Sequence, residues 1–238
     1  MSSAQLRGVI FDMDGVLVDS HAVHRKAWRR FFQTLGRDVP ESELDFILDG
    51  RKRGDILRHF LGNSPDPELE EFGKRKDCIF RQMRLDVSPI PGAVRMVREL
   101  HGMGAALALA TSASRSRAHS TLVDLGLLNC FQQVVTGEDV LLGKPDAAVY
   151  QLARSRIGIE PEHLLAVEDA VPGIRAAVAA GLHCVGVASH ETPENLRAAG
   201  AVHVLQDFES VSAHDLECIL PAGDHGRVSR QAAAVGRG

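Results

Sequence analysis

The chain has 238 residues, which is enough for one or two domains with a buried core. Its composition is 45% hydrophobic and 24% charged, with a formal net charge of -4; this is typical of a soluble globular protein and argues against a dedicated nucleic-acid binder. No apolar run approaches the ~18 residues of a membrane span, and no signal-peptide pattern opens the chain. The four cysteines are scattered, without a CxxC pair, which favours a reducing, cytoplasmic location. We expect a monomer with no membrane or nucleic-acid partner.

The first predicted strand covers residues 7–11 and leads directly into Asp12-Met13-Asp14-Gly15. Residues 20–87 then contain no strand-like run. Segments such as 27–35 and 55–61 instead place apolar residues at helical spacing. We therefore expect residues 20–87 to form an inserted helical domain.

From residue 88 onward, predicted strands and helices alternate. Helices often follow a proline or end at a glycine, as helix termini do. Strands are expected at 105–111, 134–136, 164–168, 184–187 and 202–205, and helices at 91–100, 115–125, 147–155, 172–181 and 193–199.

This alternation predicts βαβ units and a parallel sheet. The predicted fold class is α/β, with a doubly wound, Rossmann-like parallel sheet as the core and an inserted α-helical cap. The core is expected to comprise residues 1–19 and 88–221, and the cap residues 20–87. Residues 222–238 are expected to form a mobile tail, because they are short, polar and glycine-containing.

Polar residues follow several of the predicted strands. In an open parallel sheet, ligands bind beyond the carboxyl ends of the strands, so these residues should share one edge. They are Asp12, Asp14, Thr111, Ser112, Lys144, Glu168 and Asp169. Each of these short motifs alone has an ordinary explanation as a turn or a helix cap. Their occurrence together, in order at successive strand ends, favours a functional site.

Phosphoryl transfer is the chemistry that this set indicates. Clustered carboxylates repel one another unless a hard cation such as Mg²⁺ lies between them. One carboxylate can also act as a nucleophile and form an aspartyl phosphate. A lysine and a hydroxyl can then balance the charge on the transferred group.

The segment 11–20 reads Phe-Asp-Met-Asp-Gly-Val-Leu-Val-Asp-Ser and resembles the first motif of the haloacid dehalogenase (HAD) superfamily of phosphotransferases. Thr111, Lys144 and the pair Glu168-Asp169 match its second, third and fourth motifs in order. The resemblance extends to about residue 205, and the helical insert resembles the small cap of that superfamily.

The resemblance implies a role for each motif residue. Asp12 would be the nucleophile and Asp14 the general acid and base, while Thr111 and Lys144 would hold the phosphoryl oxygens. Mg²⁺ would be held by Asp12, the backbone carbonyl of Asp14, Glu168 and Asp169.

The insert carries a narrower resemblance, to the β-phosphoglucomutase family. The residues that carry it are His24 and Trp28, four positions apart, the loop Gly50-Arg51-Lys52-Arg53, and Lys76. Lys76 lies in a basic stretch that is expected to open the last cap helix at Lys74. The resemblance implies that Arg53 grips a second phosphate and that His24 and Lys76 bind the sugar. Trp28, Gly50, Ser112 and Ala113 complete the expected substrate-binding set, and Arg115 stands where that family has a substrate-contacting Asn.

Two enzymatic interpretations follow, and a small phosphorylated sugar is the expected substrate of both. The favoured one is a mutase that interconverts β-glucose 1-phosphate and glucose 6-phosphate; the alternative is a phosphatase acting on a small sugar phosphate. A third interpretation, an inactive domain that only binds sugar phosphate, is disfavoured because Asp12, Asp14, Lys144 and Asp169 are all present.

Overall fold

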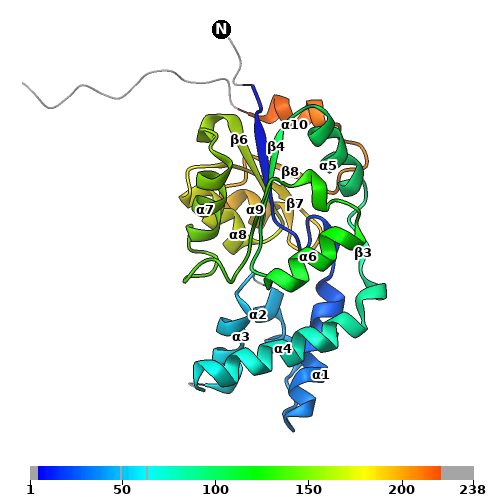
Figure 1. Ribbon diagram of the computed structural model, residues 1–238, viewed down its shortest axis with the longest axis vertical. Helices are drawn as coiled ribbons and strands as arrows, with labels where there is room; N and C mark the ends of the chain where they lie inside the picture. The colour runs from blue at the N-terminus through cyan, green and yellow to red at the C-terminus, as the bar shows by residue number, and fades with distance from the viewer. Residues whose placement is uncertain (1–4, 49, 63, 221–238) are drawn as a thin grey trace, which may run out of the picture.

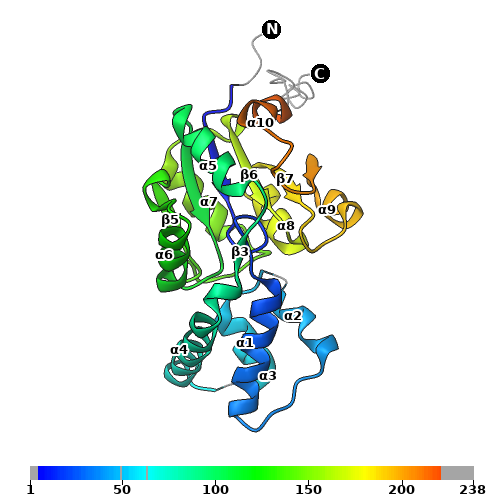
Figure 2. The same cartoon turned by 90° about the vertical axis from the view of Figure 1, so that its right-hand side faces the viewer.

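The structure is a computed structural model that describes residues 5–48, 50–62 and 64–220. A sheet flanked by helices forms one part, and a group of helices, α1 to α4, lies beyond one end of the sheet (Figures 1 and 2). The tail expected at residues 222–238 lies outside the described residues. None of the described helices is both long and apolar enough to cross a membrane.

Within the described part of the chain, six parallel strands form the sheet, in the order β5-β4-β1-β6-β7-β8. The strands are β1 (Gly8–Phe11), β4 (Ala106–Ala110), β5 (Gln133–Val135), β6 (Leu164–Glu168), β7 (His183–Val187) and β8 (His203–Leu205). Every residue of β1 and β6 is buried, as expected of central strands covered on both faces. The predicted doubly wound α/β sheet is confirmed.

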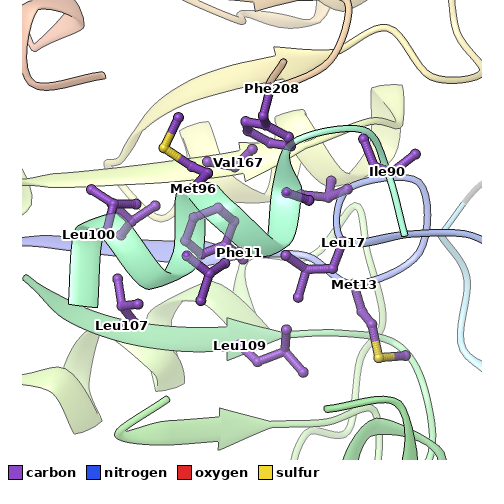
Figure 3. Packing of buried hydrophobic residues seen from close by; sticks show 14 of the residues in the cluster. Phe11, Met13, Leu17, Ile90, Met96, Leu100, Leu107, Leu109, Val167 and Phe208 are labelled. Atoms are coloured by element: carbon purple, nitrogen blue, oxygen red, sulfur yellow. The ribbon is translucent and has the colours of Figure 1, made fainter. Parts of the chain in front are cut away.

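Alternate residues of the strands point to two separate hydrophobic layers. One layer packs strand residues such as Phe11 and Leu109 against α5 (Ala93–Gly102), α6 (Arg115–Asp124) and α10 (Ala213–Ile219). Figure 3 shows Phe11, Leu107 and Val167 of this layer beside Met96 of α5. The other layer packs residues such as Ile10 against α7 (Ala148–Ile157), α8 (Val171–Ala179) and α9 (Pro193–Ala199).

The described residues of the insert form the α-helices α1 (His21–Thr34), α2 (Asp45–Leu48), α3 (Arg53–Leu61) and α4 (Asp66–Gln82). They enclose a hydrophobic core of their own, centred on Trp28, Phe31, Phe32 and Leu57. The expectation that the last cap helix opens at Lys74 was wrong. Helix α4 begins eight residues earlier because Pro65 and Pro67 favour a helix start, which places Lys74 in its middle.

Two short strands connect the insert to the sheet. β2 (Val18–Asp19) pairs antiparallel with β3 (Ser88–Pro89), with Val18 opposite Pro89. The chain thus leaves and re-enters the sheet part at one place, and the carboxyl ends of the strands face the insert (Figures 1 and 2).

Candidate active site

Three buried carboxylates meet beyond the ends of β1 and β6. Oxygens of Asp12, Glu168 and Asp169 all lie within 4.8 Å of one another. Their closeness depends on Gly15, whose φ is 75°, because a Cβ at that position would lie 1.9 Å from Oδ2 of Asp169. A side chain there would push the Asp169 carboxylate out of the cluster.

Lys144 reaches this cluster from the loop that precedes α7. Its Nζ donates to Oδ1 of Asp12 at 2.6 Å and also to Oε1 of Glu168. Burial disfavours the charge of Lys144, but the Asp12 and Glu168 carboxylates outweigh this and raise its pKa. The hydroxyl of Tyr150 donates to the same Glu168 oxygen at 2.9 Å, so Glu168 is held from two sides.

The donor set fits Mg²⁺. Burial raises the pKa of Asp12 well above its ordinary value, and burial raises the pKa of Asp169 to about 6. In both groups burial is the largest cause of the raised pKa, and the neighbouring Glu168 carboxylate adds to it. Magnesium prefers such oxygen ligands and takes few of them from the protein, leaving positions for water and phosphate oxygens.

Asp14 lies beside the cluster and is held by several donors. Arg117 donates to both of its oxygens, at 2.7 Å to Oδ1 and 2.5 Å to Oδ2. Ser20 donates to Oδ1 at 2.6 Å, and Nε2 of His24 lies 3.4 Å from the same oxygen. Burial opposes the charge of Asp14, but Arg117 outweighs it and holds the pKa of Asp14 well below its usual range.

Arg117 was not among the residues expected in the site. It is the third residue of α6, and its side chain is 11% exposed. Arg115, which stands where the related family has a substrate-contacting Asn, points away from the cavity: its side chain is 59% exposed and donates to Asp139 at 2.8 Å. Two positions that are two residues apart on a helix face different directions, which explains why Arg117 faces the site while Arg115 faces solvent.

The insert contributes a buried His–Lys pair. Nζ of Lys76 donates to Nδ1 of His24 at 3.1 Å, so Nε2 of His24 is the ring nitrogen that carries hydrogen and faces Asp14. Lys76 is 3% exposed and lies over the rings of Trp28 and Phe80, at 5.1 and 5.0 Å from their centroids. Burial, followed by the Lys76 charge, lowers the pKa of His24 to about 3.

Hydrogen bonds close the insert over the sheet part. Oγ of Ser112 donates to the carbonyl of Gly50 at 2.5 Å, and Nζ of Lys52 donates to the carbonyl of Val140 at 2.6 Å. Arg53 pairs with Asp77 at 2.5 Å, and Asp77 also accepts from Ser114. These contacts join the insert directly to the sheet part.

A cavity of about 70 Å³ lies between these groups. All thirteen residues expected in the site line it: Asp12, Asp14, His24, Trp28, Gly50, Arg53, Lys76, Thr111, Ser112, Ala113, Lys144, Glu168 and Asp169. Thr111 is 1% exposed and its hydroxyl accepts from the backbone N–H of Ala113 at 3.2 Å. The cavity also includes His21, Asp77 and Arg117, which sequence reasoning missed.

The chain belongs to the haloacid dehalogenase-like hydrolase family, whose sequence pattern matches residues 9–187. Its relatives within that family include sugar phosphatases. It is 32% identical to validoxylamine A 7'-phosphate phosphatase from Streptomyces hygroscopicus subsp. limoneus, over 85% of this chain and 94% of the relative. It is 34% identical to fructose-1-phosphate phosphatase YqaB from Escherichia coli, over 76% of this chain and 95% of the relative.

Mutases are also among the similar proteins. β-Phosphoglucomutase from Bacillus subtilis is 29% identical over 76% of this chain and 83% of its own length. The crystal structure of β-phosphoglucomutase from Clostridium difficile superimposes with a TM-score of 0.80 at 21% identity, covering 90% of this chain and 97% of that one. The latter likeness is one of fold.

Proposed function

We propose that this enzyme hydrolyses phosphate monoesters of small sugars or polyols through a phosphorylated Asp12. An Asp12 oxygen attacks phosphorus while the bond from phosphorus to the leaving oxygen breaks, and Asp14 gives that oxygen its proton. Water then attacks the same phosphorus, Asp14 takes up a proton from the water, and Asp12 is released. Mg²⁺ held by Asp12, Glu168, Asp169 and the Asp14 carbonyl would offset negative charge on the phosphoryl oxygens.

The balance of charge in the cavity carries the choice of a phosphatase. Among the described residues that line it, besides His21 and His24, are five carboxylates and five lysine or arginine side chains: Asp12, Asp14, Asp77, Glu168 and Asp169 against Arg51, Arg53, Lys76, Arg117 and Lys144. A divalent cation and a doubly charged phosphoryl group cancel each other. A neutral leaving group therefore completes the balance, whereas a second phosphate adds uncompensated negative charge in a buried place.

The position of Arg53 supports the same choice. A mutase that works through a bisphosphate needs a cation for the second phosphate, and the resemblance assigns that task to Arg53. Here the Arg53 guanidinium is already paired with Asp77 at 2.5 Å. The two phosphatase relatives, at 32% and 34% identity, also favour hydrolysis.

Residues 20–87 act in this proposal as a cap that opens and closes about the β2–β3 pair. The Ser112–Gly50 hydrogen bond and the Lys52 contact to Val140 would form on closure and exclude bulk water from the transfer step. Opening would admit the substrate and release the product.

A mutase remains the second candidate, because Arg53 and Lys76 do line the cavity as that resemblance implies. A screen tests both. The full chain is incubated with hexitol, ketose and aldose phosphates, with Mg²⁺ or with EDTA, and free phosphate and isomerised ester are measured separately. Mg²⁺-dependent release of phosphate is expected; isomerised ester without free phosphate would support the mutase, and no reaction with any ester would refute both.

A further inference from the structure

The three clustered carboxylates differ in the side chains that face them. Lys144 donates to both Asp12 and Glu168. Asp169 is faced instead by a histidine, because Nε2 of His21 lies 3.2 Å from its Oδ2. An ionised carboxylate can only accept hydrogen bonds, so Nε2 is the ring nitrogen that carries hydrogen and donates to Asp169. His21 thus contacts the site in a way that the reaction steps proposed above do not use.

The contact between His21 and Asp169 is buried and tightly enclosed. Their side chains are 9% and 5% exposed. The His21 ring packs against the ring of His190, in the loop after β7, with the ring centroids 4.5 Å apart. Gly15 leaves the space in which the two side chains meet, because a Cβ there would lie 1.9 Å from Oδ2 of Asp169 and 2.8 Å from Cε1 of His21. The local packing therefore holds the histidine ring against the carboxylate.

His21 is the first residue of α1, and the start of this helix is anchored at two acids of the sheet part. Oγ of Ser20, the preceding residue, donates to Oδ1 of Asp14 at 2.6 Å. Nε2 of His24, in the same first turn, lies 3.4 Å from the same oxygen. His21, between them in the sequence, reaches Asp169 instead. These contacts fix the backbone that carries His21 relative to the cluster.

A metal ligand binds more tightly when it is already oriented. A carboxylate that becomes ordered only when the cation arrives loses side-chain freedom at that moment, which weakens binding. Protein groups that hydrogen-bond a ligating carboxylate avoid this loss, and their removal typically weakens metal binding about 10–100-fold. The His21 contact is made to one oxygen of Asp169 and leaves the other for the cation.

We propose that His21 is a positioning residue for the metal, which holds the Asp169 carboxylate in the orientation that binds Mg²⁺. The inference rests on the cation site of the proposed function, and it does not depend on whether water or a sugar hydroxyl receives the phosphoryl group. The insert then contributes to metal binding, although the proposed ligands all lie in the sheet part. Because binding free energies are reciprocal, bound metal must in turn stabilise the start of α1.

Metal binding in the absence of substrate tests the proposal. Mn²⁺ takes the same oxygen ligands as Mg²⁺, and the EPR signal of the free ion gives its dissociation constant for the full chain. His21→Ala should weaken Mn²⁺ binding about 10-fold. His21→Gln can place an amide N–H near the position of Nε2, so its affinity should lie closer to that of the wild type than to that of His21→Ala.

Two further variants separate the hydrogen bond from packing. His21→Phe keeps a ring against His190 but has no donor, so it should weaken Mn²⁺ binding as His21→Ala does. Val23→Ala removes buried methyl groups from the same turn of α1, where Val23 packs with Ala27 and Phe80. It should lower the midpoint of thermal unfolding and leave the Mn²⁺ affinity at the wild-type value. Each variant is titrated at a temperature at which circular dichroism shows it to be folded.

The outcomes separate this inference from the proposed function. Wild-type Mn²⁺ affinity in His21→Ala or His21→Phe overturns the inference, and so does a loss in His21→Gln as large as that in His21→Ala. An equal loss in Val23→Ala overturns it as well, because general loosening of α1 would then explain the effect. Wild-type enzyme that releases no phosphate from any ester refutes the proposed function, while the Mn²⁺ titration still reports whether His21 positions Asp169.

Discussion

Arg117 donates one hydrogen bond to each carboxylate oxygen of Asp14, although 103 residues separate them in the chain. The pair joins the turn after β1 to the first turn of α6. Bidentate arginine–carboxylate pairs are directional, so Arg117 sets the orientation of Asp14. In this arrangement Asp14 is ionised. Before Asp14 can donate a proton to the leaving oxygen, it must lose part of its contact with Arg117.

A double-mutant cycle on this pair should reveal strong coupling. Arg117→Met leaves the Asp14 carboxylate buried without its main donors, and we expect the free energy of unfolding to fall by about 3 kcal/mol. Asp14→Asn with Arg117→Met should cost clearly less than the sum of the single changes. Arg115→Met, which breaks an exposed pair with Asp139 on the same helix, should cost less than about 1 kcal/mol. Additive urea-unfolding energies would show that the pair is not coupled.

Asp12→Asn should abolish turnover and preserve the fold. A carboxamide cannot attack phosphorus to form the acyl phosphate, so kcat should fall by about 10,000-fold or more. The hydrogen bond that Asp12 accepts from Lys144 can still be made by the amide oxygen, so thermal unfolding should remain cooperative. Activity near the wild-type level in a contaminant-free sample would remove Asp12 from its role.

Removal of the metal should stop the reaction reversibly. EDTA should abolish phosphate release, and Mg²⁺ should restore it. Asp169→Ala should raise the Mg²⁺ concentration needed for half-maximal activity by about 100-fold or more, because it removes an oxygen donor of the cluster. Glu162 is an exposed acid just before β6, the strand that leads to Asp169. Glu162→Ala is therefore the matched control and should behave as the wild type. Normal turnover in chelated enzyme would contradict the magnesium site.

Lys76 is expected to cost stability at neutral pH. Burial lowers its pKa from 10.5 to about 8, so the folded state disfavours the proton that the unfolded chain retains. This penalty is complete below pH 8 and disappears as the pH rises from about 8 to 10.5. The shift corresponds to a penalty of about 3 kcal/mol. Replacing Lys76 also removes its hydrogen bond to His24, which is worth about 1 kcal/mol.

Lys76→Met should therefore stabilise the protein by about 2 kcal/mol at pH 7 and by much less at pH 10. Urea unfolding at both pH values measures this difference. Lys74→Met, on an exposed position of the same helix, should change little at either pH. A destabilised Lys76→Met protein at pH 7 would show that the lysine is better paired than its burial indicates.

The fold was largely predictable because its central strands are continuous apolar runs, as in the Gly8–Phe11 strand. The two-residue pairing of Val18 with Pro89 was not, since it joins segments 71 positions apart with no local pattern. Helix α10 was also missed, although Ser212 and Asp215 form a capping box that marks its start. Helix α1 begins at His21 rather than near residue 27, because its first turns bury histidines that interrupt the apolar spacing.

The motif residues of the site were predictable because they follow strands, and strand ends converge at one edge of a parallel sheet. The position of Arg117 depends instead on the direction in which α6 leaves that edge. In the sequence Arg117 is one of two arginines in the run Ser-Arg-Ser-Arg at 114–117, and nothing in the run distinguishes it from Arg115. Tyr150 and His21 likewise touch Glu168 and Asp169 only through packing between distant elements.

The destination of the phosphoryl group tests the central claim most directly. Enzyme with Mg²⁺ is given β-glucose 1-phosphate and, separately, the best ester of the screen, each with a trace of the matching bisphosphate, and phosphorus NMR follows free phosphate and isomerised ester in one tube. If Asp12 passes its phosphoryl group to water, free phosphate appears at the rate at which each accepted substrate disappears. Glucose 6-phosphate that forms faster than free phosphate would contradict a phosphatase and identify a mutase.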